Sequence, residues 1–313
     1  MQRSILAALA LIALAAASPV AAGEMSSEIA AAVKDIGPII DPPATAALFA
    51  PLQKKEPYAC VTVARDERYG SDPRNRLDVF KPASAEKTLR PILIFVHGGA
   101  YTGGDKHPPG NPFYDNIMLW AAANGMVGVN ITYRLAPEHP YPAGVEDVAM
   151  AVQWTLENAA RFGGDPRRIF LMGHSAGAVH VATYIAHPEF QKVKGGGLAG
   201  AILVSGIYEL SPDTDGPSQR AYFGADLSKW ADRSSMKGLI STKLPLLVAR
   251  AQYDPTMFIV QGDVLNAAMC SGTSGCPTYL ILPGHSHMSE IYSINTDETR
   301  LTFEINSLVA KVK

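Results

Sequence analysis

The sequence IFLMGHSAGAVHVATYI at residues 169–185 decides the fold. Its first four residues are all apolar and typical of a buried strand, and the Ala- and Val-rich run from Val179 to Ile185 predicts a helix. Between them, Gly173 and Gly177 allow a turn that is too tight for side chains at those positions. A strand, a tight turn and a helix in this order lift Ser175 above the sheet edge, beside the positive end of the helix. Taken alone, the same pattern also fits a plain glycine-rich turn.

Around this stretch, short apolar runs alternate with helix-like segments. Continuous apolar strands alternating with helices predict a mostly parallel sheet that is covered on both faces. Two earlier runs joined by a polar turn predict an antiparallel edge. The predicted strands are residues 59–63, 77–80, 92–96, 126–132, 169–172, 201–204, 246–251 and 278–282, and the clearest helices are 144–158, 179–185 and 262–269.

We expect an α/β catalytic domain at residues 58–313, preceded by a helical or loose segment at residues 23–57 that covers part of the site. Ser26 is placed to cap a first helix. The prolines that follow, from Pro38 to Pro51, are expected to break helical structure. The Asp- and Ser-rich residues 208–244 interrupt the strand–helix rhythm and are a candidate cap.

Residues 1–22 have the three-part pattern of a signal peptide. Arg3 gives a positive start, an apolar run follows from Ile5 to Ala17, and small residues up to Ala22 offer a cleavage site. The alternatives are a membrane anchor or an ordinary first helix, but the apolar run is short for a membrane span. We therefore expect an exported protein, periplasmic or secreted, without stable membrane insertion.

The composition excludes some function classes. A net charge of -2 and 18% charged residues in 313, with no block of one sign, argue against a nucleic-acid partner. Hydrophobic residues make up 47% of the chain, which is ample for a large core. Because no Cys-x-x-Cys pair or His/Cys cluster suggests a metal site, we expect neither metal nor organic cofactor.

The chain has three cysteines, Cys60, Cys270 and Cys276. Export implies an oxidising compartment, in which disulfides form and persist. Ser-Gly-Thr-Ser-Gly separates Cys270 from Cys276 and is flexible enough to bring their sulfurs together. We therefore predict that these two are bridged and that Cys60 is free; the alternative is three reduced thiols.

A second motif, residues 97–100 (HGGA), follows a predicted apolar strand directly. Acyl transfer needs backbone N–H groups aimed at the oxyanion that develops during the reaction, and consecutive small residues can expose them. We assign the N–H groups of Gly99, Ala100 and Ala176 to this oxyanion hole, with Gly98 as an alternative to one of the loop donors. For His97 we prefer a structural role in holding the loop over a catalytic one.

Three motifs together resemble a known family. HGGAY at 97–101, YRLAPEHPYPA at 133–143 and GHSAG at 173–177 are similar in order and spacing to the hormone-sensitive-lipase-like carboxylesterases of the α/β-hydrolase fold. The resemblance includes their small bacterial, arylformamidase-like relatives and runs from about residue 75 to about residue 292.

Two residues depart from the usual pattern of that family. The lipase-like group usually has an aspartate before the serine, where this chain has His174. It also usually has a third glycine where this chain has Ala100. Both departures favour the arylformamidase-like side of the family.

The resemblance implies that an acid and then a histidine follow the serine. Asp254 comes after the predicted strand 246–251, in the strand-end loop where the resemblance places the acid. An acid there orients the histidine and stabilises the imidazolium. Asp263 is the alternative, but it lies inside the following helix pattern.

Two histidines follow the last predicted strand. His287 is followed by the apolar Met288 and His285 by Ser286. Because related enzymes tend to place an apolar residue after the catalytic histidine, we choose His287 and leave His285 as a polar loop residue. Tyr101, Tyr222, Phe223 and Trp230 fit a substrate pocket and the core equally well.

These residues predict a serine hydrolase that cleaves small carboxylic esters through an acyl-enzyme, with a Ser175–His287–Asp254 triad. An arylformamide or an acetylated sugar is the alternative substrate on the same fold. A non-catalytic binding module is a further alternative, although such a module has no need of all three groups. We expect short acyl chains to be preferred, because no large apolar insert is visible.

Overall fold

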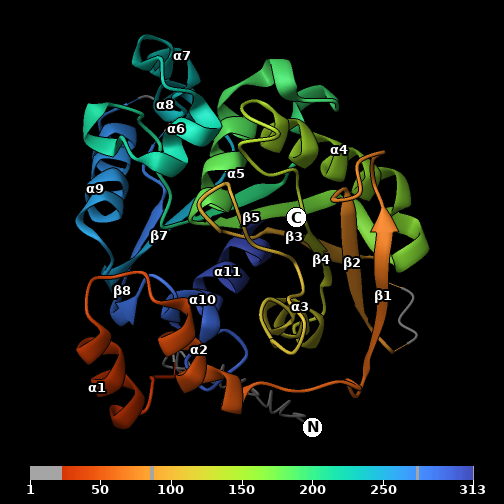
Figure 1. Ribbon diagram of the computed structural model, residues 1–313. Coiled ribbons are helices and arrows are strands. Elements are labelled where there is room, and N and C mark those ends of the chain that lie inside the picture. The colour runs from red at the N-terminus through yellow and green to blue at the C-terminus, as the bar shows by residue number, and fades with distance from the viewer. Residues whose placement is uncertain (1–22, 85–87, 273–274, 313) are drawn as a thin grey trace, which may run out of the picture.

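The computed structural model describes residues 23–84, 88–272 and 275–312 (Figure 1). The predicted signal peptide, residues 1–22, lies outside the described residues, so export stays a prediction. Among the described residues, no helix has both the length and the apolar character that crossing a membrane requires.

An eight-stranded sheet forms the centre of the molecule, in the order β1-β2-β4-β3-β5-β6-β7-β8. β1 pairs antiparallel with β2, and β2 pairs antiparallel with β4. All other neighbouring strands are parallel, which confirms the predicted parallel sheet and its antiparallel edge. The strands are β1 (Val61–Arg68), β2 (Arg76–Pro82), β3 (Arg90–Val96), β4 (Val127–Ile131), β5 (Gly164–His174), β6 (Gly200–Val204), β7 (Leu246–Tyr253) and β8 (Thr278–Ser286).

Several strands extend beyond the apolar runs that predict them. β5 begins at Gly164 and includes the polar Arg167 and Arg168 before its apolar part. Its first residue pairs with Arg90 at the start of β3. The register shifts before the next pair, Ile92 with Ile169, so the polar residues of β5 lie at an irregularity and carry no hydrophobic signal in the sequence.

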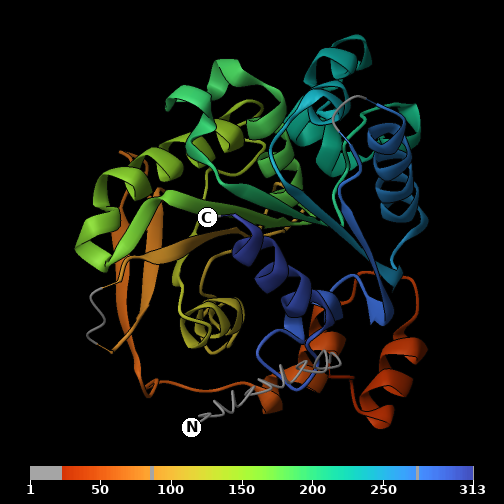
Figure 2. The same cartoon turned by 180° about the vertical axis from the view of Figure 1, so that it is seen from behind.

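Helices cover both faces of the sheet. α4 and α5 lie on one face, and α3 and α11 lie on the other (Figures 1 and 2). The helices are α1 (Ser27–Ile36), α2 (Pro42–Phe49), α3 (Asp115–Ala123), α4 (Ala143–Asn158), α5 (Ala176–Ala186), α6 (Pro217–Phe223), α7 (Trp230–Arg233), α8 (Met236–Ser241), α9 (Thr256–Ser271), α10 (Ser289–Tyr292) and α11 (Arg300–Lys311). Short 3₁₀ turns include η1 (Ala50–Leu52), η2 (Ala159–Phe162), η3 (Pro188–Phe190), η5 (Pro212–Thr214) and η6 (Leu227–Lys229).

The core is correspondingly divided into two main layers. One layer packs the sheet against α4, α5, α8 and α9, and includes Val148, Val181 and Leu265. The other packs it against α3, α11 and the N-terminal helices, and includes Ile117 and Ile305. This arrangement is an α/β-hydrolase fold, as predicted.

The N-terminal segment contains a second helix, α2, which the prolines in the sequence argued against. Ser26 caps α1 as expected, because its side chain accepts a hydrogen bond from the N–H of Ile29. Pro42 and Pro43, however, do not break a helix but begin α2, which Asp41 caps. At the first turn of a helix the N–H that proline lacks has no partner anyway, so proline is tolerated there. The expectation that these two prolines interrupt structure was therefore wrong.

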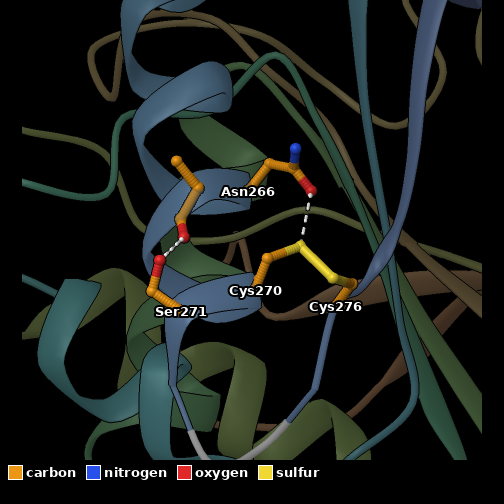
Figure 3. Close-up of a disulfide and its surroundings, with 5 residues drawn as sticks. Asn266, Cys270, Ser271 and Cys276 are labelled. Carbon is orange, nitrogen blue, oxygen red and sulfur yellow. Dashed lines mark hydrogen bonds between the residues drawn. A yellow bond between two sulfur atoms is a disulfide. The ribbon is translucent and has the colours of Figure 1, made fainter.

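Cys270 and Cys276 form a disulfide bond, and Cys60 is free and exposed, as predicted. Figure 3 shows the bridge, which joins the end of α9 to the chain just before β8. It thereby closes the connection between two neighbouring elements at one edge of the sheet.

Residues 208–244 form a group of short helices, α6 to α8, above the sheet (Figure 1). Tyr222, Phe223 and Trp230 from this group are fully buried and pack in a small third cluster with Tyr101 and Val179. Although this stretch is mostly polar in composition, these three aromatic side chains anchor it to the sheet domain by apolar packing.

Candidate active site

Ser175 stands on a sharp turn between β5 and α5, and its backbone has φ 55° and ψ -124°. The flanking glycines make this turn possible. A Cβ on Gly177 would lie 2.1 Å from the carbonyl oxygen of Val96, and one on Gly173 would lie 2.4 Å from that of Gly177. The N–H of Ser175 donates to the carbonyl of Val204 at 2.9 Å, which ties the turn to β6.

Asp254 and His287 come together at the same edge of the sheet. Asp254 follows β7 and His287 follows β8, and the Nδ1 of His287 lies 2.7 Å from Oδ1 of Asp254. The other carboxylate oxygen of Asp254 accepts hydrogen bonds from the hydroxyl of Ser205 at 2.6 Å and the N–H of Ala251 at 2.8 Å. Because the carboxylate holds Nδ1–H, the Nε2 of His287 is the nitrogen left to accept a proton. This Nε2 has no hydrogen-bond partner within the described part of the chain.

His285 and Asp263, the alternatives to His287 and Asp254, make other contacts. His285 is buried, and its Nδ1 lies 3.2 Å from the hydroxyl of Ser289. Asp263 is on α9 and pairs with Arg250 at 2.8 Å. Neither residue lines a cavity that contains Ser175.

The loop after β3 runs directly against Ser175. A Cβ on Gly98 would lie 3.0 Å from the Cβ of Ser175. Gly99 and Ala100 both have positive φ values, 125° and 52°. No described residue accepts a hydrogen bond from the N–H groups of Gly99, Ala100 or Ala176. These three N–H groups are therefore available to a substrate oxygen.

His97 supports this loop from below. It has no exposed surface, and burial lowers its pKa to about 4. Its ring stacks on Tyr133 with centroids 4.5 Å apart, and the hydroxyl of Tyr133 donates to the carbonyl of His97 at 2.9 Å. A Cβ on Gly104 would collide with the same ring at 2.6 Å, so the loop is folded closely around it. The neutral, enclosed imidazole fits the structural role preferred for it.

Two cavities meet at Ser175. One, of about 310 Å³, is lined by Tyr101, Ala176, Met257 and Phe258, and the other, of about 330 Å³, by residues that include His287. Ile40 and Ala100 line both cavities, as does Ser175 itself. The second cavity is bounded by the side chains of Phe113, Tyr114, Met288 and Tyr292.

A larger groove of about 750 Å³ lies elsewhere, around Arg134, Glu146 and Lys192. None of the predicted site residues lines it, and it is open and polar. We therefore place the site at the two smaller cavities, where the chemically distinctive groups converge.

Of the four aromatic residues left open by the sequence, Tyr101 lines the first cavity. Tyr222, Phe223 and Trp230 line neither cavity and lie in the cluster that anchors α6 to α8. Tyr101 stacks on Tyr222 with centroids 4.9 Å apart, so the anchor also supports the cavity wall.

Two buried ionisable groups lie beside the site, and the sequence motifs assign a role to neither of them. The Nε2 of His174 lies 2.8 Å from the carbonyl oxygen of His287 and 3.4 Å from Oε1 of Glu290. Burial lowers the pKa of His174 well below its usual range, and His287 adds to the effect. Burial raises the pKa of Glu290 well above its usual range, and the nearby carboxylate of Asp254 adds to the rise. Both shifts favour the neutral form of the group.

His174, His287 and Glu290 also present ligand atoms within 4.8 Å of one another, the spacing of a metal site. However, Nδ1 of His287 already faces Asp254, and Nε2 of His174 already faces a carbonyl oxygen. One ring nitrogen of each histidine is therefore already engaged within the protein, and we interpret the group as a hydrogen-bonded cluster of the site.

Comparison with known proteins adds independent evidence. Residues 93–288, well over half of the chain, match the family described as alpha/beta hydrolase fold. Carboxylesterase NlhH of Mycobacterium tuberculosis (strain CDC 1551 / Oshkosh) is 44% identical over 89 residues, which are 28% of this chain and 26% of the relative. Esterase LipC of Mycobacterium tuberculosis (strain ATCC 25618 / H37Rv) is 29% identical over 238 residues, covering 70% of this chain and 58% of LipC. The chain thus spans less than two thirds of the length of these curated relatives.

Among solved structures, Esterase B from Lactobacillus rhamnosis, inhibited by a tributyrin phosphonate, superposes with a TM-score of 0.69. The match covers 91% of this chain and 95% of that one at 18% identity, so it supports the fold alone. Fold, motifs and family match agree, and this chain therefore belongs to the alpha/beta hydrolase fold family.

Proposed function

We propose that this protein is a carboxylesterase that cleaves small esters, with Ser175 as nucleophile, His287 as general base and Asp254 as its orienting acid. The observation that carries the proposal is the 2.7 Å contact between Asp254 and Nδ1 of His287, at a cavity that both His287 and Ser175 line. The names of the relatives NlhH and LipC, a carboxylesterase and an esterase, also support it.

The mechanism proceeds in two acyl-transfer steps. Nε2 of His287 takes the hydroxyl proton as Ser175 attacks the ester carbonyl, and the same imidazolium then protonates the leaving alcohol. Water attacks the acyl-enzyme in the second step, with His287 again as base. The backbone N–H groups of Gly99, Ala100 and Ala176 stabilise the oxyanion in both steps.

The size of the cavities supports small substrates. At about 310 and 330 Å³ they are near the lower end for small-molecule sites, which typically run from about 300 to 1,000 Å³. Because both meet at Ser175, one accommodates the acyl group and the other the alcohol. We therefore expect acetyl and butyryl esters to be cleaved faster than palmitoyl esters.

A substrate panel tests the proposal. The purified protein is assayed with p-nitrophenyl acetate, butyrate and palmitate, with an N-formyl anilide and with an acetylated sugar. The short p-nitrophenyl esters should give the highest kcat/KM. Faster cleavage of palmitate would contradict the size argument, and a clear preference for the formyl anilide or the sugar would move the activity to that substrate class.

Labelling with a fluorophosphonate probe separates an enzyme from a non-catalytic binding module. An activated serine should be labelled covalently, and the label should map to the peptide that contains Ser175. Absence of both labelling and ester hydrolysis in folded protein would leave a binding module as the better reading.

A further inference from the structure

The two principal catalytic groups of the proposed site are delivered by strands that are not neighbours. Ser175 follows β5 and His287 follows β8, and β6 and β7 lie between them in the sheet. Main-chain pairing between adjacent strands therefore does not by itself fix the distance between serine and histidine. General-base catalysis is sensitive to that distance, because a displacement of 1 Å can cost about 10²-fold in rate.

His174 provides a direct polar link between these two segments. It immediately precedes Ser175, and its Nε2 lies 2.8 Å from the carbonyl oxygen of His287. A carbonyl oxygen can only accept a hydrogen bond, so Nε2 of His174 must carry the hydrogen. Its Nδ1 has no partner among the described residues, which is consistent with a neutral ring in the Nε2–H form. His174 is 1% exposed and lines the cavity of the site.

We propose that His174 is a positioning residue, which donates its Nε2–H to the carbonyl oxygen of His287 and thereby holds the histidine loop in register with the nucleophile turn. The inference rests on the proposed function, because it concerns the placement of the general base. His174 itself transfers no proton to the substrate.

Glu290, on α10, lies beside this link. It lies three residues after His287, has no exposed surface, and presents Oε1 3.4 Å from the same Nε2. Asp254 already carries the negative charge of this site, and a second unpaired charge nearby would be unfavourable in a buried region. The raised pKa of Glu290 accordingly favours its neutral form beside the imidazole. The rings of His174 and His287 approach with centroids 4.7 Å apart, so the imidazole has little space in which to reorient.

This hydrogen bond gives a physical reason for His174 at the position where the family usually has an aspartate. An aspartate at position 174 would present only acceptor atoms to the carbonyl of His287, and it could not make the same hydrogen bond while ionised. The histidine in this chain therefore makes a contact that the residue usual in the lipase-like group cannot make.

A matched pair of amide variants tests the proposal. In His174→Gln, the side-chain N–H₂ can reach the position of Nε2, whereas in His174→Asn it reaches only the position of Nδ1. We expect His174→Gln to keep kcat within about fivefold of wild type. We expect His174→Asn to lose about 10- to 100-fold in kcat with KM changed by less than about threefold, because substrate contacts remain. Rates are expressed per active site titrated with a fluorophosphonate, so unfolded protein is not counted.

Two kinetic results would overturn the proposal: a kcat for His174→Asn equal to wild type, or an equal loss in the Gln and Asn variants. A measurement on the unaltered protein is independent of whether the variants fold. ¹⁵N NMR of histidine-labelled protein reports the tautomer of His174 directly. The His174 signals are assigned by their absence from the spectrum of His174→Gln or, should that variant not fold, by through-bond correlation. A neutral ring with hydrogen on Nε2 across pH 6–8 is expected; hydrogen on Nδ1 alone would rule out the donated bond.

Failure of the proposed function would look different. Wild-type protein would then hydrolyse no ester and Ser175 would not be labelled. Failure of this inference alone would leave an active wild type, a labelled Ser175 and an His174→Asn variant with undiminished kcat.

Discussion

Asp115 and Glu290 are both carboxyl groups with no exposed surface, yet the fold neutralises them in different ways. Asp115, on α3, accepts hydrogen bonds from the guanidinium of Arg65 at 2.5 and 2.9 Å and from the hydroxyl of Tyr58 at 2.7 Å. Glu290, on α10, has no hydrogen-bond partner for either oxygen among the described residues, and the imidazole of His174 lies 3.4 Å from its Oε1. One carboxyl is balanced by a cation, whereas burial favours the protonated form of the other.

This difference indicates where the fold serves stability and where it serves chemistry. The cluster around Asp115 extends to Asp78, which pairs with Arg65 at 2.7 Å and with Lys106 at 2.9 Å, so each buried carboxylate has a cation beside it. At the site, Nε2 of His287 and both oxygens of Glu290 lack partners within the described structure. Since buried polar groups are normally paired, the unpaired ones beside this cavity are candidates for a role other than stability.

The largest expected effect is the loss of activity when the nucleophile of the site is removed. Ser175→Ala removes the nucleophile but keeps a Cβ on the strained turn, so the fold is expected to be unchanged. Loss of a triad nucleophile typically lowers kcat by on the order of 10⁴- to 10⁶-fold. We therefore expect ester hydrolysis to fall to that extent while the urea midpoint stays at the wild-type value.

Steady-state rates on p-nitrophenyl butyrate and urea unfolding curves measure the two quantities. A purified variant whose activity lies within tenfold of wild type would exclude Ser175 as the nucleophile. A large drop in stability would instead mean that the turn depends on the serine hydroxyl.

A smaller effect, on stability alone, is expected when the ion pair in the Asp115 cluster is broken. Arg65→Met leaves Asp115 buried without its cation, and breaking one side of a buried ion pair typically costs about 3–5 kcal/mol. Because the Arg65 side chain is 25% exposed, we expect the lower end of that range. The urea midpoint should fall, whereas kcat per titrated active site should remain that of wild type.

The control for this variant is Arg161→Met, which removes the same side chain from an exposed pair with Glu67. Pairs at the surface contribute little, so the urea midpoint of the control should barely move. Equal destabilisation by both substitutions would show that the Asp115 cluster has no special role. A reduced kcat in Arg65→Met would show that the two clusters are coupled.

Much of the sheet could be predicted because its central strands are continuous apolar runs. α11 could also have been found, since Leu301, Ile305 and Leu308 recur at helical spacing. α3 is harder to recognise, because even its polar Asp115 and Asn116 are buried. Burial on every side leaves no alternating pattern in the sequence.

The candidate site also has a part that the sequence predicts and a part that it does not. Ser175, Asp254 and His287 could be chosen because each follows a predicted strand in a recognisable motif or order. The link between His174 and His287 joins residues 113 positions apart, and it exists only because the turn after β5 and the loop after β8 approach each other in the fold. In the sequence, His174 is visible only as a departure from the family pattern, and Glu290 carries no signal at all.

The smallest effect concerns the proton on Glu290. Burial, with a contribution from Asp254, raises the pKa of this carboxyl well above its usual range, whereas in the unfolded chain it titrates near about 4.3. Above that pH, unfolding releases a proton from Glu290, so the folded state loses stability relative to the unfolded state as the pH rises. The slope is at most about 1.4 kcal/mol per pH unit and ends at the folded pKa. Glu290→Gln has no such proton, so its stability relative to wild type should increase with pH.

Urea unfolding of both proteins at pH 5, 6, 7 and 8 measures this difference. The groups that face Glu290, namely His174, Asp254 and Ser205, are present in both proteins, so the separate titration of His174 largely cancels in the difference. Glu138→Gln, at an exposed loop position, should show no such trend with pH. If the gap between Glu290→Gln and wild type is constant from pH 5 to 8, Glu290 does not change its protonation on unfolding in that range. The contrast with Asp115 would then be one of partners alone, since both carboxyls would be ionised in the fold.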